Sequence, residues 1–243
     1  YVDMAFEKIS NFFKGRLVIL ESTVSPGYTR IAGQQYLGQR LLLNGGNVSL
    51  CFSPEREDPG NEKFTNVEIP KVIGGLTQEC LERGVRLYMR IFQHVAQATS
   101  VEAAEFCKVH ENTFRAINIT YVNQVRNLSE KLNVDFEEVV NLAKTKPFGF
   151  MPFSSGVGIG GHCIPIDPYF MLQVAEKYDV NFSTVEAAME EISVSALNTA
   201  NWISENIEPD KILITGVAYK DNISDTRCSP SLELLAILSD KYK

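Results

Sequence analysis

The sequence predicts an α/β fold in which a partial parallel sheet is followed by an all-helical region and then by the start of a second α/β unit. Short apolar segments alternate with helical patterns in the first part. A helical pattern free of Gly and Pro then runs from Val101 to about Leu132, and an apolar strand pattern returns at Lys211–Thr215. The expected parts are residues 1–98, 99–206 and 207–243.

The first part alternates helices with strands. Ser25 and Pro26 are typical of an N-cap followed by a proline in the first turn, so we expect a helix from there to about Leu37. The other elements are identified by amphipathic spacing or by short apolar runs. They are helices at Asp3–Lys14 and Thr77–Arg90, and strands at Arg16–Leu20, Val48–Phe52 and Lys71–Ile73. This alternation favours a parallel sheet with helices on both faces.

The rest of the chain is mainly helical. Asp135 is the expected cap of a short helix, a loop rich in Gly and Pro covers Lys144–Pro168, and Ser229-Pro230 is expected to start the last helix. The remaining helices are expected at Phe136–Ala143, Tyr169–Tyr178 and Thr184–Asn206. Lys211–Thr215 is expected to be a buried strand.

Composition excludes several classes of partner. The net charge is -7 and there is no basic run, which argues against the phosphate backbone of a nucleic acid as a ligand. No apolar run reaches the roughly 20 residues of a membrane span. The five cysteines lie far apart, without a Cys-x-x-Cys pair. This argues against zinc fingers and disulfide scaffolds and indicates a reducing, cytoplasmic compartment.

Polar residues follow three of the predicted strands. Glu21-Ser22-Thr23 ends the first, Ser53-Pro54-Glu55-Arg56 ends the second, and a segment ending in Lys220 follows the last. Ligands of open parallel sheets bind beyond the carboxyl ends of the strands, so these positions predict a binding site. The alternative is that strand ends are exposed and polar in any protein.

One face of the long helix carries Lys108, Asn112 and Arg115, which follow each other at helical spacing. This shared face is a candidate for a functional site. The alternative is a solvated face on which Glu111 and Arg115 form a surface salt bridge.

A loop rich in glycine and proline surrounds Cys163. Gly160 and Gly161 let the backbone pass close to a ligand or to another segment, and prolines flank Asp167. A thiolate is a strong nucleophile toward carbonyl carbon, and a cation such as Lys108 would lower the pKa of the thiol or stabilise an oxyanion. The alternative is a buried structural cysteine. A zinc site with His162 is disfavoured because adjacent ligands have poor geometry, and no serine lies in a nucleophile elbow.

The sequence resembles the NAD-dependent UDP-sugar 6-dehydrogenase family. Five motifs carry the resemblance, in the family's order: Ser22-Thr23-Val24-Ser25-Pro26-Gly27, Ser53-Pro54-Glu55-Arg56-Glu57-Asp58-Pro59-Gly60, Glu105-x-x-Lys108-x-x-x-Asn112, Gly160-Gly161-His162-Cys163-Ile164-Pro165-Ile166-Asp167-Pro168, and Tyr219-Lys220-x-x-x-x-Asp225-x-Arg227-x-Ser229-Pro230. The resemblance implies a partial Rossmann-like parallel sheet, a central helical dimerisation region and the start of a second Rossmann-like domain, which binds UDP.

The family oxidises a sugar C6 alcohol twice, to a carboxylate, with two NAD per turnover, for polysaccharide precursors. The resemblance implies that Cys163 holds the intermediate as a thiohemiacetal and then as a thioester. Lys108 and Asn112 would hold the oxyanion or the water, and Asp167 would act as a base or orient that water. Thr23 and Glu55 would contact the cofactor and the reacting end of the sugar, with Glu55 activating water.

The resemblance also assigns the ligand contacts. Lys220, Gly160 and Arg115 would join Lys108 and Asn112 in binding the UDP-sugar, and Arg227 would lie near NAD. The alternative is that Lys220 and Arg227 form salt bridges with Asp221 and Asp225 and bind no ligand. No metal is implied.

The sugar is expected to be a UDP-N-acetylhexosamine, because His162 and Ile166 differ from the residues of the UDP-glucose branch. We place UDP-N-acetylglucosamine first and UDP-N-acetylmannosamine second, with UDP-glucose as an alternative. Ser154 and Ser155 stand where relatives often carry a Pro-Gly-Pro-Gly loop, which affects the shape of the sugar site. A hydroxy-acid dehydrogenase with a similar long helix would not need Cys163.

The family's N-terminal Gly-x-Gly-x-x-Gly loop, which cradles the NAD pyrophosphate, does not occur in the first part of the sequence. The glycines that begin at Gly156 do not join a strand to a helix, so they are not interpreted as this loop. We therefore expect the chain to be part of a longer protein. The resemblance also implies a homodimer built on the long helix. The alternative is an incomplete catalyst that acts as a nucleotide-sugar binding or dimerisation module.

Overall fold

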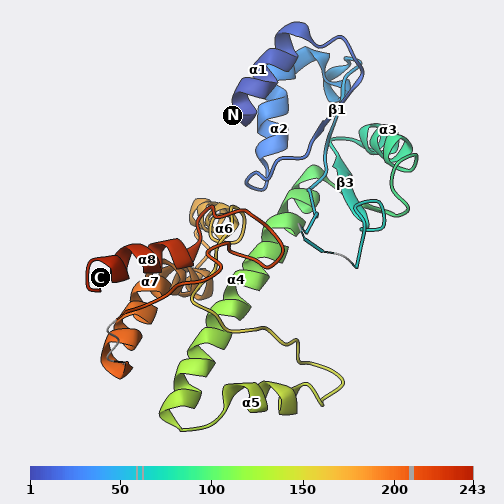
Figure 1. The fold of residues 1–243 in the computed structure, drawn as a ribbon. Helices are drawn as coiled ribbons and strands as arrows, with labels where there is room; N and C mark the ends of the chain where they lie inside the picture. The colour runs from blue at the N-terminus through green and yellow to red at the C-terminus, as the bar shows by residue number, and fades with distance from the viewer. Residues whose placement is uncertain (59, 62, 208–210, 243) are drawn as a thin grey trace. The chain divides into compact units, whose positions relative to one another are not determined.

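The computed structural model describes residues 1–58, 60–61, 63–207 and 211–242 (Figure 1). It divides the chain into two compact units. The first comprises Tyr1–Glu111 and Tyr169–Asp179, and the second Asn112–Pro168 and Val180–Lys243. Among the described helices, none is long and apolar enough to cross a membrane.

A four-stranded sheet forms the centre of the first unit. Its strands are β1 (Leu17–Leu20), β2 (Ser49–Phe52), β3 (Lys71–Gly75) and β4 (Val95–Gln97), side by side in that order. The parallel expectation holds for β1 with β2 and for β3 with β4 but is wrong for β2 with β3, which run antiparallel. A parallel neighbour needs a crossover, usually through a helix, whereas no helix is described between β2 and β3.

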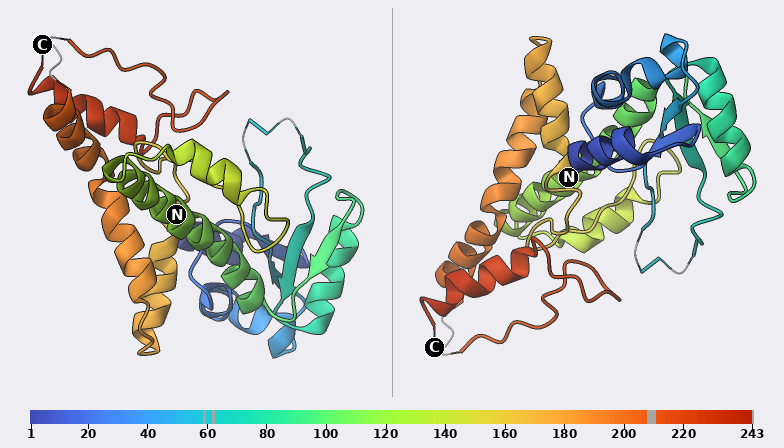
Figure 2. Two further views of the ribbon diagram at one scale, coloured as in Figure 1. Left: turned by 90° about the horizontal axis from the view of Figure 1, so that it is seen from below. Right: turned by 90° about the horizontal axis from the view of Figure 1, so that it is seen from above.

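Helices cover both faces of this sheet, as predicted. Figures 1 and 2 show α3 on one face and α1 with α2 on the other. The bounds are α1 Val2–Phe12, α2 Tyr28–Ala32 continued by the π-helical η1 Gly33–Leu37, the 3₁₀ turns η2 Gly38–Arg40 and η3 Leu42–Asn44, and α3 Gln78–Tyr88. The core joins Phe6 of α1 and Leu81 of α3 to β2, all of whose residues are buried.

The start of α2 differs from the prediction. The helix begins at Tyr28 rather than after Ser25, and Gly27, with φ of 95°, is its N-cap. The buried carboxylate of Glu105 accepts the backbone N–H groups of Gly27 at 2.6 Å and of Thr29 at 2.7 Å. A helix N-terminus needs acceptors for its first N–H groups, and here a distant side chain supplies them in place of Ser25.

The second unit is helical. Its helices are α4 (Val101–Lys131), which begins in the first unit, α5 (Phe136–Ala143), α7 (Ser183–Asn206) and α8 (Pro230–Ser239). Helix α6 (Asp167–Lys177) has only its first two residues in the second unit, and the rest belongs to the first. Asp135 caps α5 through the N–H of Glu137 at 2.9 Å, as predicted. Val122 of α4 packs against α5, and Ala196 and Ala200 of α7 pack against α8. These contacts form two small cores.

The prediction of a strand at Lys211–Thr215 is wrong. The segment has no regular secondary structure, and Ile212 and Ile214 pack against the α7–α8 core, whereas Leu213 between them is 86% exposed. The alternating burial is that of a strand, but a strand also needs a neighbour for its backbone hydrogen bonds. No segment in the described part of the chain pairs with it.

Candidate functional site

Cys163 is exposed, so the alternative of a buried structural cysteine is wrong. A tight turn holds it. The carbonyl oxygen of Cys163 accepts the N–H of Ile166 at 3.0 Å and that of Asp167 at 2.7 Å. Helix α6 begins at Asp167, so the cysteine lies one turn before a helix N-terminus. The partial positive charge of such an end favours an anionic thiolate.

Asp167 and Asn112 lie together in the second unit. Asp167 is 4% exposed, and its Oδ2 accepts a hydrogen bond from Asn112 Nδ2 at 2.6 Å. Asn112 is itself buried and belongs to α4. The bond ties the cysteine turn to the long helix, which brings two of the predicted site residues into direct contact.

The two glycines before His162 approach another segment of the chain rather than open space. A Cβ on Gly160 would lie 2.5 Å from Tyr219 Cβ and 3.0 Å from the carbonyl oxygen of Cys228. Gly161 has φ of 89°, and its N–H donates to the carbonyl oxygen of Arg227 at 3.1 Å. The fourth and fifth motifs of the sequence therefore form one packed surface in the second unit.

We predict that Gly160→Ala separates these two segments. The added methyl group meets backbone and Cβ atoms that cannot move aside, so the free energy of unfolding should fall by about 1–3 kcal/mol. Urea denaturation and hydrogen exchange of residues 219–230 measure the change. Gly156→Ala is the matched control, because a Cβ there meets nothing within 4 Å. Equal effects of the two variants would contradict the predicted contact.

Arg227 pairs with Asp225, as the alternative reading of this motif proposed. Arg227 Nη2 lies 2.6 Å from Asp225 Oδ2. The bond lowers the pKa of Asp225 to about 2. The pKa of Arg227 is raised, first by Asp225 and in smaller part by the nearby Cys163. The Arg227 side chain is nonetheless 67% exposed and can still contact an anionic ligand.

The predicted residues of α4 differ in their surroundings. Lys108 is half-buried and lies one turn before Asn112, but it belongs to the first unit. Arg115 is exposed. The alternative of a Glu111–Arg115 salt bridge is wrong, because Glu111 pairs with Arg56 at 2.7 Å.

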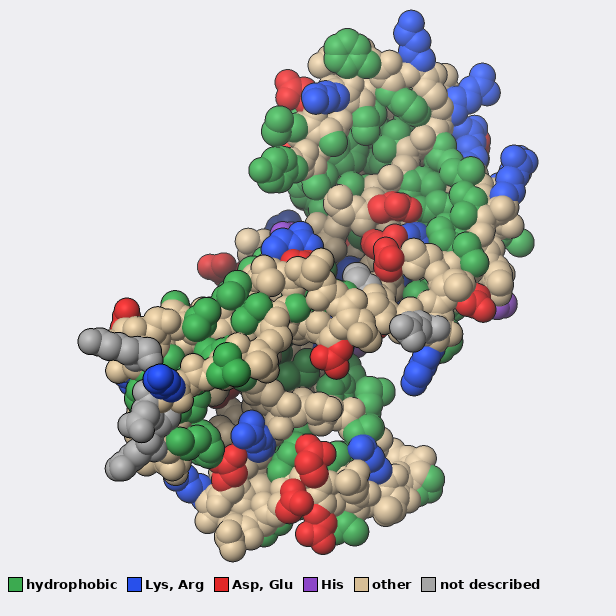
Figure 3. All heavy atoms as spheres, viewed as in Figure 1, with side chains coloured by type: hydrophobic (Ala, Val, Ile, Leu, Met, Phe, Trp, Pro, Cys, Tyr) green, Lys and Arg blue, Asp and Glu red, His purple; other side chains and the backbone are tan. Residues whose placement is uncertain are grey.

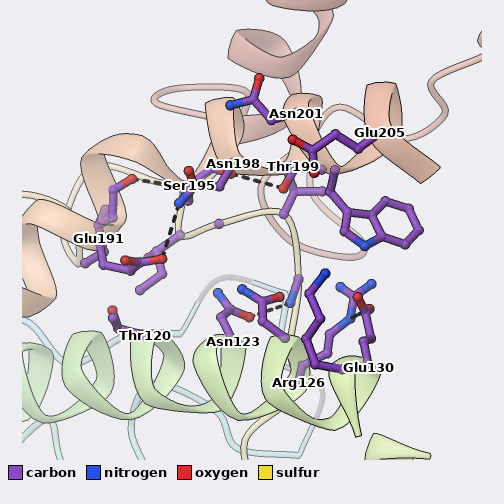
Figure 4. Close-up of a pocket in the computed structure, with 18 residues that line it drawn as sticks. Thr120, Asn123, Arg126, Glu130, Glu191, Ser195, Asn198, Thr199, Asn201 and Glu205 are labelled. Carbon is purple, nitrogen blue, oxygen red and sulfur yellow. Dashed lines mark hydrogen bonds and ion pairs between the residues drawn. The ribbon is translucent and has the colours of Figure 1, made fainter. Parts of the chain in front are cut away.

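A cleft of ≈ 280 Å³ lies between α4 and α7 in the second unit (Figure 4). The glycine loop crosses it, and Asn123 Oδ1 of α4 accepts the N–H of Gly156 at 2.9 Å. On the α7 side, Gly158 passes so close to Ser195 that a Cβ would lie 2.4 Å from the serine hydroxyl. The cleft walls therefore fix the path of the loop that leads to Cys163.

Thr23 and Glu55 lie in the first unit, beyond the carboxyl ends of β1 and β2. Thr23 is half-buried and Glu55 is exposed. Figure 3 shows acidic side chains at the surface in this region, beside the strands of the first unit. Because β1 and β2 are parallel, this edge fits the position at which open sheets bind dinucleotides.

Sequence reasoning missed a buried lysine at this edge. Lys71 Nζ lies 2.9 Å from Glu55 Oε2 and 3.6 Å from Glu21 Oε1. The hydroxyl of Tyr88 donates to Glu21 as well. The available signal was Lys71 itself, a charged residue at the start of a buried apolar strand. The sequence analysis expected β2 and β3 to be parallel, and that arrangement would have placed Lys71 and Glu55 at opposite edges of the sheet.

The environment keeps Glu55 ionised. Burial works to raise its pKa, but the hydrogen bond from Lys71 and those from the N–H groups of Arg56 and Glu57 outweigh it, so the pKa lies below its ordinary value. Among the described residues, no three His, Cys, Asp or Glu side chains gather to hold a metal ion.

The comparison with protein families decides the classification. Residues 1–92 match the NAD binding domain of the UDP-glucose/GDP-mannose dehydrogenase family, and residues 102–193 match its central domain. The chain belongs to this family. The first match supports NAD as the cofactor of this dehydrogenase chain.

Similar proteins within this family include UDP-N-acetyl-D-mannosamine dehydrogenases. The UDP-N-acetyl-D-mannosamine dehydrogenase of Campylobacter jejuni is 31% identical over 99% of this chain and 61% of its own length. That of Methanocaldococcus jannaschii is 31% identical over 99% of the chain and 55% of its own length. The structure of the UDP-D-ManNAc dehydrogenase from Pyrococcus horikoshii matches with a TM-score of 0.86 at 30% identity, over 100% of the chain and 59% of that protein. The chain thus spans less than two thirds of these relatives.

Proposed function

We propose that the protein oxidises the C6 alcohol of a UDP-N-acetylhexosamine to the uronic acid, by two successive hydride transfers. The observation that carries the proposal is the exposed Cys163, held in a turn that the Asn112–Asp167 hydrogen bond ties to α4. The family of the chain and the names of its relatives support the reaction class. NAD supplies the hydride acceptor in both oxidations when it is bound.

Cys163 carries the sugar between the two oxidations in this proposal. The first oxidation removes a hydride and a proton from the C6 alcohol and leaves an aldehyde. The Cys163 thiolate adds to its carbon, and the oxyanion that forms takes up a proton to give a thiohemiacetal, which loses a second hydride and a proton to become a thioester. Water then cleaves the carbon–sulfur bond, and the carboxylate leaves while the thiol is restored. Covalent capture prevents escape of the aldehyde between the two oxidations.

The other residues act on protons and oxyanions in this proposal. Asn112 and Lys108 donate to the oxygen that carries the negative charge of the tetrahedral intermediates. Asp167 orients Asn112, or accepts the proton of the attacking water. Glu55, which is held as a carboxylate, accepts a proton from water during thioester cleavage. Thr23 contacts the cofactor and the reacting end of the sugar.

Four further residues contact the two ligands. Gly160, Arg115 and Lys220 bind the UDP-sugar, and Arg227 lies near NAD. The names of the relatives favour UDP-N-acetylmannosamine over the UDP-N-acetylglucosamine that the motifs placed first. The product would serve as a polysaccharide precursor. The wide spacing of the five cysteines, without a Cys-x-x-Cys pair, supports a reducing compartment such as the cytoplasm.

The test is NADH formation by the full-length protein with a panel of UDP-sugars. Two NADH per sugar and a UDP-N-acetylhexosaminuronic acid, identified by mass spectrometry, are the expected results. One NADH per sugar, or turnover of UDP-glucose alone, would overturn the proposal. Binding of UDP-sugars without NADH formation would favour the alternative of a nucleotide-sugar binding module.

We also propose a homodimer built on α4. Phe114, Tyr121 and Leu128 recur at every seventh residue, which places them along one face of the helix, and they are 43%, 63% and 59% exposed. A second copy of the helix would cover this stripe. Sedimentation of the full-length protein should give a dimer, and Tyr121→Glu should shift it toward the monomer. A monomeric wild-type protein would contradict the proposal.

A further inference from the structure

Lys71 is a buried cation that the reaction described above does not use. Its side chain is only 5% exposed, and its ammonium group contacts the carboxylates of Glu55 and Glu21. The ring of Phe92 lies below the charge, with its centre 5.4 Å from Nζ. Burial of a lysine is costly unless the charge is paired. The surroundings of Lys71 meet that requirement with two carboxylates.

Backbone register places Lys71 opposite Glu55. Strands β2 and β3 are antiparallel, with Cys51 opposite Gly75 and Phe52 opposite Gly74. Continuation of this register by three residues sets Glu55 opposite Lys71, in agreement with the 2.9 Å between their charged atoms. The contact therefore follows from the sheet itself and does not depend on a chance meeting of flexible side chains.

We propose that Lys71 is a positioning residue that holds the Glu55 carboxylate where it accepts a proton from water in thioester cleavage. The inference rests on the proposed function, because it assigns Lys71 to the same step. The side chain of Glu55 is 55% exposed and lies in the loop after β2, where its other carboxylate oxygen accepts the N–H groups of the adjacent Arg56 and Glu57. The buried Lys71 at the start of β3 adds a restraint on Glu55 from a neighbouring strand.

Removal of Lys71 has a definite effect on the ionisation of Glu55. The charged and titratable groups near the pair are Glu21 after β1, Tyr88 from α3, Arg56 and Glu57 next to Glu55, and Glu111 of α4, which pairs with Arg56. Without the ammonium group, burial is opposed only by the N–H groups of Arg56 and Glu57, and the pKa of Glu55 rises. A base is active above its pKa, so the acidic limb of the rate profile moves to higher pH.

The experiment is the pH dependence of kcat for Lys71→Met in the full-length protein. We expect the acidic limb to move up by about one pH unit or more, with KM for the UDP-sugar little changed. Lys71→Arg, which keeps the charge, should restore the limb toward its wild-type position. Lys8→Met, at an exposed lysine of α1, is the matched control and should leave the profile unchanged.

A second variant keeps the proposal testable if Lys71→Met does not fold. Glu21→Gln removes the competing carboxylate but keeps an acceptor for Tyr88, so Lys71 should bind Glu55 more strongly and the acidic limb should move to lower pH. An equal loss of rate at every pH in Lys71→Met, or an unmoved limb in both variants, would overturn the role of Lys71. Absence of NADH formation in the wild-type protein at every pH would instead refute the proposed function.

Discussion

Replacement of Cys163 by serine in the full-length protein is expected to lower the steady-state rate of NADH formation by at least about a thousandfold. A serine hydroxyl is almost entirely protonated near neutral pH and is a poor nucleophile without an adjacent base. The first oxidation does not need the sulfur, so a single turnover should still release up to one NADH per site. Stopped-flow absorbance separates this first turnover from the blocked steady state.

Cys228→Ser is the matched control. Cys228 is also exposed and lies in the segment that packs against Gly160, but it has no role in the proposed chemistry. Its replacement should leave the rate close to that of the wild-type protein. If Cys163→Ser still formed two NADH per sugar at an undiminished rate, covalent capture by sulfur would be wrong and the aldehyde would react as its hydrate.

The local elements of the fold could be predicted because local signals fix them. Apolar runs gave β1, β2 and β3, and the cap at Asp135 gave the start of α5. The pairing of strands depends on the connection between them. The loop after β2 carries no described helix to turn the chain, so β3 returns antiparallel and carries Lys71 back to Glu55. No local pattern at Lys71 shows this.

Tertiary contacts also override local signals at helix ends. Ser25 and Pro26 are a good local start, yet α2 begins at Tyr28 because Glu105 offers a better acceptor for its N–H groups. The contact of Asn112 with Asp167 joins residues 55 positions apart. Both side chains could be selected from the motifs, but only the folded chain shows that they bind each other.

Glu105→Leu is expected to lower the free energy of unfolding by about 2–4 kcal/mol, because the N–H groups of Gly27 and Thr29 lose their acceptor. Glu105 is fully buried and leucine fills similar space, so loss of packing is a minor part of the effect. Glu102→Leu is the matched control. Glu102 lies one turn earlier on α4 and also contacts α2, through Arg30, but the pair is partly exposed and should contribute at most about 1 kcal/mol. Equal losses in the two variants would contradict the capping role of Glu105.

The pH dependence of stability shows whether burial or hydrogen bonding has the larger effect on the pKa of Glu105. Burial raises the pKa of Glu105, and the hydrogen bonds from Thr29 and Gly27 only partly oppose it. A carboxyl whose folded pKa exceeds its unfolded value contributes most to stability below the unfolded pKa, and this contribution is lost as the pH rises through the folded pKa. Relative to Glu105→Gln, the wild-type protein should therefore lose stability as the pH rises from about 4 toward neutrality. Urea denaturation at a series of pH values, with hydrogen exchange of residues 22–32 as the local readout, measures this difference. A stability difference that instead grew in favour of the wild-type protein toward neutral pH would show that the two N–H donors hold the ionised form more strongly than burial opposes it.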